Sequence, residues 1–102
     1  ITGGGFPDNI PRVLPDSAAV RLDLDAIDPP PVFGWLAKEG GVIEKEMLRT
    51  FNCGVGMIVV AEAAKAGEVE AALRNAGEKP VRVGEIIARD GEAVVTTGKL
   101  KL

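Results

Sequence analysis

The sequence predicts an α+β fold of the broad α/β class, in which helices pack on one face of a mainly antiparallel, mixed sheet. Three observations predict it: alternating apolar residues at 18–24, an unbroken apolar run at 57–61, and a helical repeat at 65–76. With 102 residues, the chain has room for one domain at most. The expected order is helix, strand, two helices, strand, helix and two strands, over 5–15, 18–24, 31–38, 44–49, 57–61, 65–76, 81–89 and 92–97.

Proline and glycine set the ends of the early elements. Pro15 ends the first short helix, because proline cannot continue an α-helix. Pro31 can occupy the first position of the second helix, which Gly40 and Gly41 end. A third short helix over 44–49 follows directly.

The predicted strands differ in how many faces they bury. Val20, Leu22 and Leu24 alternate with charged residues, which is typical of a strand with one buried face. The run 57–61 contains no polar residue, so we expect a central strand that is buried on both faces. The Asp-Gly pair at 90–91 predicts a β-hairpin between the last two strands.

The clearest helical pattern lies over 65–76. Its apolar residues recur with the period of an α-helix and share one face. Gly77 follows at a position suited to ending the helix. The residues of this face are Ala66, Val69, Ala72, Leu73 and Ala76.

Composition excludes several classes of function. A net charge of −3, with three Phe, one Trp and no Tyr, provides no basic or stacking surface for nucleic acid. No apolar run reaches the ~18 residues that would indicate a membrane span. The chain has no histidine and one cysteine, so we expect neither an intrachain disulfide nor a metal site. Without a histidine to activate its thiol, Cys53 is expected to be a small, partly buried hydrophobic residue.

A glycine run opens the chain, with Gly3, Gly4 and Gly5 after Thr2. Because glycine has no Cβ and tolerates positive φ, successive N–H groups can converge on an anion such as phosphate. A tight turn explains the same residues without any ligand. The run by itself leaves both interpretations open.

A second glycine-bearing loop follows the third predicted helix. Arg49 can bind phosphate or carboxylate through two hydrogen bonds, and Asn52 can both donate and accept. Gly54 allows a ligand to approach the backbone closely. An ordinary helix-to-strand turn with a surface arginine explains this pattern equally well.

The two loops together resemble one enzyme family. The segments ITGGGF and NIPRVLP, then VFGWL, then MLRTFNCGVGM occur in that order. In this combination they closely resemble phosphoribosylformylglycinamidine cyclo-ligase, the aminoimidazole ribonucleotide synthetase of purine biosynthesis. Related amidotransferases, selenophosphate synthetases and thiamin-monophosphate kinases share the architecture. We do not expect them to carry both the glycine-run segment and the 47–57 segment in this form. The resemblance covers nearly the whole chain.

The resemblance implies that 1–102 is a partial C-terminal α/β domain. It also implies that ATP and Mg²⁺ are bound mainly by an N-terminal domain, which is absent from this chain. In the family, ATP phosphorylates the formyl oxygen of formylglycinamidine ribonucleotide. The amidine nitrogen then attacks the activated carbon, and ring closure releases phosphate. The residues implied to bind the substrate or its phosphate are Thr2, Gly3, Gly4, Gly5, Asn52, Gly54 and Arg49.

The resemblance also implies partners and a location. The intact enzyme is expected to be a cytoplasmic homodimer whose active site lies in the cleft between its two domains. The isolated chain is expected to be inactive. The competing interpretation is a non-catalytic regulatory module that binds a small molecule and has a ferredoxin-like layout. The absence of histidine and of a paired acid and base favours that alternative.

Overall fold

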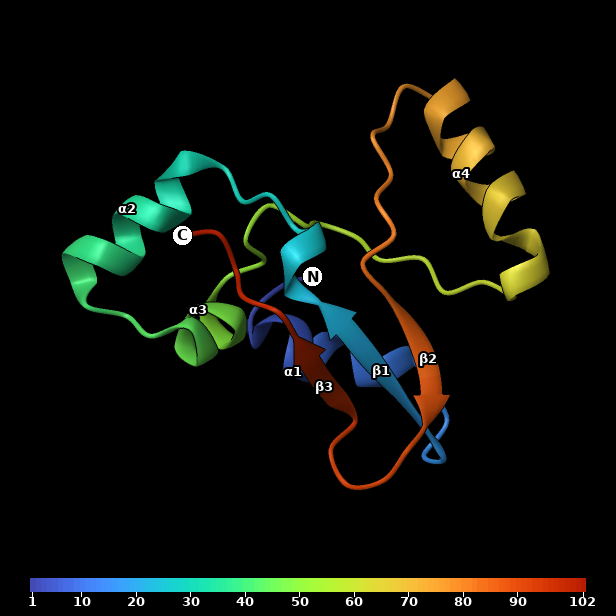
Figure 1. Cartoon of the computed structure of the whole chain (residues 1–102), viewed down its shortest axis with the longest axis horizontal. Coiled ribbons are helices and arrows are strands. Elements are labelled where there is room, and N and C mark those ends of the chain that lie inside the picture. The colour runs from blue at the N-terminus through green and yellow to red at the C-terminus, as the bar shows by residue number, and fades with distance from the viewer.

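Three strands form one mixed sheet in the computed structural model, which describes all 102 residues. β1 (Ala18–Asp23) lies at the centre. β2 (Gly84–Ala88) pairs with one edge of β1 antiparallel, and β3 (Val94–Thr97) pairs with the other edge parallel (Figure 1). The predicted α+β class and mixed sheet are confirmed.

The helices surround this sheet unequally. α1 lies behind the sheet in Figure 1, whereas α4 stands apart at the end of two extended connections. Gly41 ends α2 with a φ of 62°, and Gly77 follows α4 with a φ of 91°, so both predicted helix ends are confirmed. The α-helices are α1 (Gly5–Asn9), α2 (Pro31–Gly40), α3 (Glu44–Thr50) and α4 (Ala66–Asn75), and the 3-10 turns are Ile10–Val13, Leu24–Ala26 and Ala63–Lys65.

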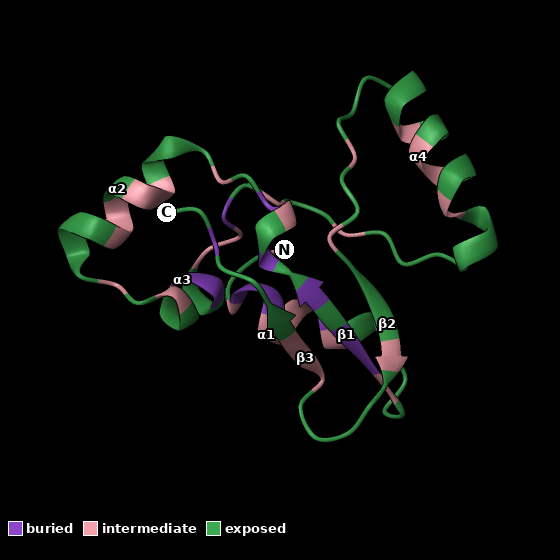
Figure 2. Ribbon diagram, viewed as in Figure 1, coloured by how far each residue is buried: buried purple, intermediate pink, exposed green.

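One small core lies between β1, α1 and α3. The alternation predicted for the first strand is confirmed, because Val20, Leu22 and Leu24 are all buried. Phe6 from α1 and Met47 from α3 belong to the same cluster. Figure 2 shows the buried residues concentrated around β1, α1 and α3, with none on α4. Because only 12 of 102 residues are buried, each core side chain carries a large share of the stability.

The predicted central strand at 57–61 is wrong. These residues are extended but belong to no sheet, and Met57 is 82% exposed and Val59 53% exposed. Their backbone groups make no hydrogen bond within the protein. The physical reason is that β1, a strand with one apolar face, is the central strand of the sheet. Both of its edges are already paired, so no edge of β1 is left for 57–61. An unbroken apolar run indicates a preference for burial and does not specify a pairing partner.

The predicted hairpin between the last two strands is also wrong. Both strands form, and the turn at Asp90-Gly91 forms with Gly91 at a φ of 104°. However, β1 lies between β2 and β3. The connection crosses the start of β1, where Arg89 N donates to Ser17 O and Val20 N donates to Ala93 O. This crossing lets β1 satisfy its backbone groups on both edges, which a local hairpin would not do.

α4 confirms the predicted helix, although its apolar face contains no fully buried residue. Its polar side is tied to the segment before β2, because Arg82 pairs with Glu70. Arg74 also approaches Glu70, at 3.6 Å. The hydrogen bond from Arg82 is the main cause that lowers the pKa of Glu70.

The exposed apolar residues around 57–60 predict that this chain self-associates. Met57, Val59, Val60 and Val81 are each at least 43% exposed, and the unpaired backbone beside them can act as a strand template. We expect dimers or larger species in sedimentation velocity. Val59→Lys should shift the distribution toward monomer, whereas Ile43→Lys, at an exposed apolar site directly before α3, should not. A wild-type chain that stays monomeric at high concentration would contradict this prediction.

Candidate functional site

The two loops predicted to bind a ligand lie side by side. The backbone nitrogen of Ile1 donates to the carbonyl of Gly56, across a sequence separation of 55 residues. α1 packs against α3, and Gly5 lies directly on the backbone of Leu48. The fold therefore brings the glycine run and the 52–56 loop into one region of the surface.

The glycines of the run have different structural roles. Gly5 is buried at a φ of 64°, and a methyl group there would collide with the carbonyl of Leu48. Gly4 has a φ of 93°, and Gly3 is exposed with open space around a Cβ position. The turn itself is closed by Gly5 N donating to Thr2 O at 3.0 Å. Gly5 is therefore required for packing and turn geometry, whereas Gly3 is not.

Two backbone donors of the run remain free. The N–H groups of Gly3 and Gly4 donate to no acceptor in the protein. Since α1 is only five residues long, its dipole adds little to the attraction of an anion. The predicted anion site therefore depends on the two free N–H groups of the run and not on a helix dipole.

Asn9 is a member of the site that sequence reasoning did not assign. Its amide nitrogen donates to the carbonyls of Gly5 at 2.8 Å, Thr2 at 3.1 Å and Gly3 at 3.4 Å. Its Oδ1 accepts from the Thr2 hydroxyl at 3.1 Å and from Arg12 at 3.3 Å. The available signal was an amide residue four positions after Gly5, within reach of the run across one helical turn.

A small cavity of about 190 Å³ opens beside these loops. Its polar wall includes Asn9 and the backbone of Gly56, and the rest of its lining is mainly apolar. None of the seven residues predicted to bind the substrate lines this cavity, although several are neighbours of its walls. The lining residues are Ile1, Asn9, Ile10, Val13, Gly56, Met57 and Ile58.

The 52–56 loop is a hydrogen-bonded turn, in which Val55 N donates to Asn52 O at 2.9 Å. Oδ1 of Asn52 accepts from the N–H of Gly54 at 2.9 Å, which leaves the amide hydrogens of Asn52 without a protein partner. Gly54 has a φ of 93° and lies against the ring of Pro30. Cys53 is confirmed as a small hydrophobic residue, but it is fully buried in the core and not partly buried as predicted. Burial raises the pKa of its thiol. The loop thus offers a free side-chain donor at Asn52.

Arg49 does not reach the glycine run in this structure. Its exposed guanidinium lies 3.6 Å from the carboxylate of Glu46, one helical turn earlier. An exposed pair of this kind contributes little to stability, so the side chain can exchange partners at low cost. The backbone of Arg49 lies next to Gly5.

The acidic residues of the chain do not form a metal site. No three acidic or cysteine side chains cluster closely enough to hold an ion. Asp23 and Asp25 are already engaged as acceptors for the backbone N–H groups of Asp25 and Lys99, at 3.0 and 3.2 Å. Without a third acidic or cysteine neighbour, these carboxylates do not provide the set of oxygen ligands that Mg²⁺ prefers.

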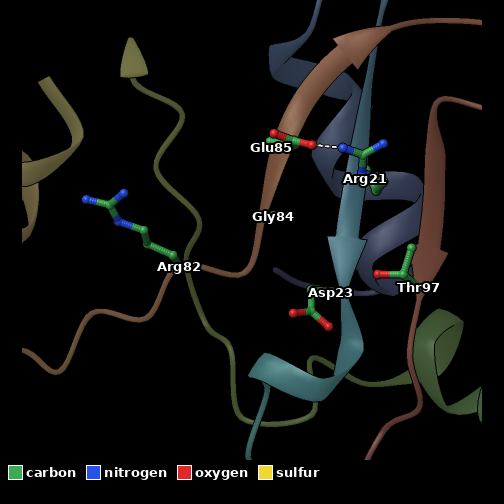
Figure 3. A pocket seen from close by; sticks show the side chains of 6 residues that line it. All are labelled: Arg21, Asp23, Arg82, Gly84, Glu85 and Thr97. Carbon is green, nitrogen blue, oxygen red and sulfur yellow. Dashed lines mark ion pairs between the residues drawn. The ribbon is translucent and has the colours of Figure 1, made fainter. Parts of the chain in front are cut away.

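A second and larger hollow of about 370 Å³ lies on the outer face of the sheet (Figure 3). Most of its charged side chains already form ion pairs, since Arg21 pairs with Glu85 across the strands and Arg82 pairs with Glu70. None of the predicted site residues lines it. It is lined by Arg21, Asp23, Arg82, Gly84, Glu85 and Thr97.

Residues 1–97 match the family model for the AIR synthase related protein, C-terminal domain. The chain belongs to this family. The match starts at the glycine run and includes the 52–56 loop and all three strands, so the candidate site lies wholly within the family domain. None of the helices combines the length and the apolar character needed to cross a bilayer.

Proposed function

We propose that this AIR synthase-related domain is the C-terminal portion of an ATP-dependent cyclo-ligase. The enzyme would close the imidazole ring of formylglycinamidine ribonucleotide to give aminoimidazole ribonucleotide, in the purine pathway. Membership of the family supports an enzyme of this broad type. The observation that carries the finer proposal is that the two distinctive loops, at 1–5 and 52–56, meet beside one cavity.

The proposed role of this surface is to bind and orient a phosphate group. The N–H groups of Gly3 and Gly4 are free to donate, and the amide of Asn52 adds a side-chain donor nearby. Fixed donors aimed at phosphoryl charge are a large source of stabilisation in phosphoryl transfer. Thr2, Gly5 and Gly54 hold the two loops in shape, and Arg49 can swing from Glu46 toward an anion.

The overall reaction then needs groups from outside these residues. ATP transfers its γ-phosphoryl group to the formyl oxygen, the amidine nitrogen forms the new C–N bond, and inorganic phosphate leaves with that oxygen. We propose that ATP and Mg²⁺ are bound mainly by an N-terminal domain of the same enzyme, which acts as a cytoplasmic homodimer. The present chain would form one wall of the cleft and would be inactive alone.

The proposal is tested by steady-state kinetics on the protein expressed from its complete gene. With formylglycinamidine ribonucleotide and ATP, we expect aminoimidazole ribonucleotide, ADP and phosphate in equal amounts. Asn52→Ala should lower kcat/KM by about tenfold or more, as expected for loss of a hydrogen bond to a charged group. Asn52→Asp keeps the acceptor for the N–H of Gly54 but removes the donor, so it should lose activity with the turn intact.

The controls separate a binding role from a folding role. Asn75→Asp makes the same chemical change at the exposed end of α4 and should leave the kinetics unchanged. Full activity in both Asn52 variants would refute the role of this loop. Tight binding of a small molecule with no turnover by the wild-type protein would instead favour the regulatory module.

A further inference from the structure

We infer that Asn9 is the positioning residue that sets the direction of the phosphate-binding donors in the glycine run. The inference rests on the proposed function, because it assumes that the N–H groups of Gly3 and Gly4 bind a phosphate. It adds a residue and a physical mechanism that the glycine pattern alone does not contain.

The geometry of the peptide bond links Asn9 to the free donors. The amide nitrogen of Asn9 holds the carbonyls of Thr2 and Gly3, at 3.1 and 3.4 Å. The carbonyl of Thr2 shares a peptide plane with the N–H of Gly3, and the carbonyl of Gly3 shares one with the N–H of Gly4. Every peptide bond in the chain is trans, so C=O and N–H point in opposite directions. Drawing both carbonyls toward Asn9 therefore turns both N–H groups away from it and leaves them free.

Asn9 acts through the backbone and not by direct contact with a ligand. Its two amide hydrogens are shared among three carbonyls, so no donor remains for a phosphate. Its Oδ1 already accepts from Thr2 and Arg12. The hydrogen bond to the Gly5 carbonyl, at 2.8 Å, anchors the side chain on its own helix, so the run is held against α1.

The residue type is specific to this task. Glycine has the widest backbone freedom, so three consecutive glycines would otherwise sample many orientations of their N–H groups. Aspartate has the same shape as asparagine but would place a carboxylate against three carbonyl oxygens. Alanine is compatible with the helix but has no side-chain donor for the carbonyls of the run.

The test measures how strongly the protein prefers a phosphorylated ligand, using the protein expressed from its complete gene. Two pairs of probes are titrated calorimetrically: ATP against adenosine, and formylglycinamidine ribonucleotide against its ribonucleoside. Asn9→Ala and Asn9→Asp should each reduce the preference in one pair by about tenfold or more, as for loss of hydrogen bonds to a charged group. The pair that changes identifies the phosphate that the run binds. Affinity for the unphosphorylated probe should stay the same, and Asn75→Asp should change neither pair.

Each outcome decides a separate point. A wild-type protein with no preference in either pair would overturn the proposed function and this inference with it. A wild-type preference that both Asn9 variants keep would overturn the inference alone. Equal losses for phosphorylated and unphosphorylated probes would show a purely structural role and would also overturn it. If Asn9→Asp does not fold, Asn9→Ala carries the test, and lower NMR order parameters for the N–H groups of Gly3 and Gly4 should accompany its loss of preference.

Discussion

Replacing Gly5 with alanine is expected to unfold the protein or to leave it insoluble. Gly5 has a φ of 64°, and an added methyl group would collide with the carbonyl of Leu48, which is backbone and cannot rotate away. The left-handed conformation costs about 1–2 kcal/mol for a residue with a Cβ. Separating α1 from α3 adds an overpacking cost of about 1–3 kcal/mol. Urea unfolding followed by circular dichroism measures the total.

Gly67→Ala provides the matched control. Gly67 is the second residue of α4, where a methyl group would meet nothing within 4 Å and φ is not positive. Alanine in place of glycine stabilises a helix by up to about 1 kcal/mol in its interior, so in this first turn a smaller rise in stability is expected. The two substitutions are chemically identical and should have opposite effects. A Gly5→Ala protein as stable as wild type would contradict the close packing of α1 on α3.

This contrast also separates the roles that the glycine run combines. In the sequence, Gly3, Gly4 and Gly5 form one uniform motif that fits a phosphate site and a tight turn equally well. The structure confirms the tight turn and the packing at Gly5, whereas the phosphate site stays a prediction that rests on Gly3 and Gly4. Gly5 is needed for packing, whereas Gly3 has free space and, like Gly4, a free N–H group. Substitution of Gly3 should therefore act on ligand binding and not on folding.

Local signals in the sequence were sufficient for most elements of the fold. The alternation at 18–24 correctly predicted β1 and its buried face, because period and burial are local properties of a strand. Pro31 and Gly41 correctly marked α2, because each acts through its own backbone angles. Pairing between strands could not be predicted in this way. It depends on competition for the two edges of β1, which β2 and β3 occupy and 57–61 does not.

In the candidate site, too, the local features could be predicted from the sequence and the contacts between distant segments could not. The two loops could be identified because their residue types are unusual and their order along the chain matches a family. That they touch depends on α1 packing on α3, which no local pattern encodes. The role of Asn9 was missed because its side chain bonds backbone carbonyls, whose positions are fixed only once the run is folded.

Replacing Leu22 with alanine is expected to have the second large effect on stability. Leu22 is fully buried near the end of β1, where it contributes to the single core cluster. Burial of this kind makes a Leu→Ala change cost about 2–5 kcal/mol, from lost transfer free energy and the cavity left behind. In a chain with so few buried residues, the loss is expected to remove most of the native population.

Ile86→Ala tests whether this effect arises from the core and not from the sheet in general. Ile86 lies on β2 directly opposite Val20, on the face that Leu22 also occupies, but it is 42% exposed at the sheet edge. A side chain that keeps this much solvent contact in the native state loses less transfer free energy, so we expect a cost below about 1.5 kcal/mol. Equal losses from Leu22→Ala and Ile86→Ala in urea unfolding would show that the core lies elsewhere. A larger loss at Leu22 would show that the face of β1 packed against α1 and α3 supports the whole domain, including the two loops of the candidate site.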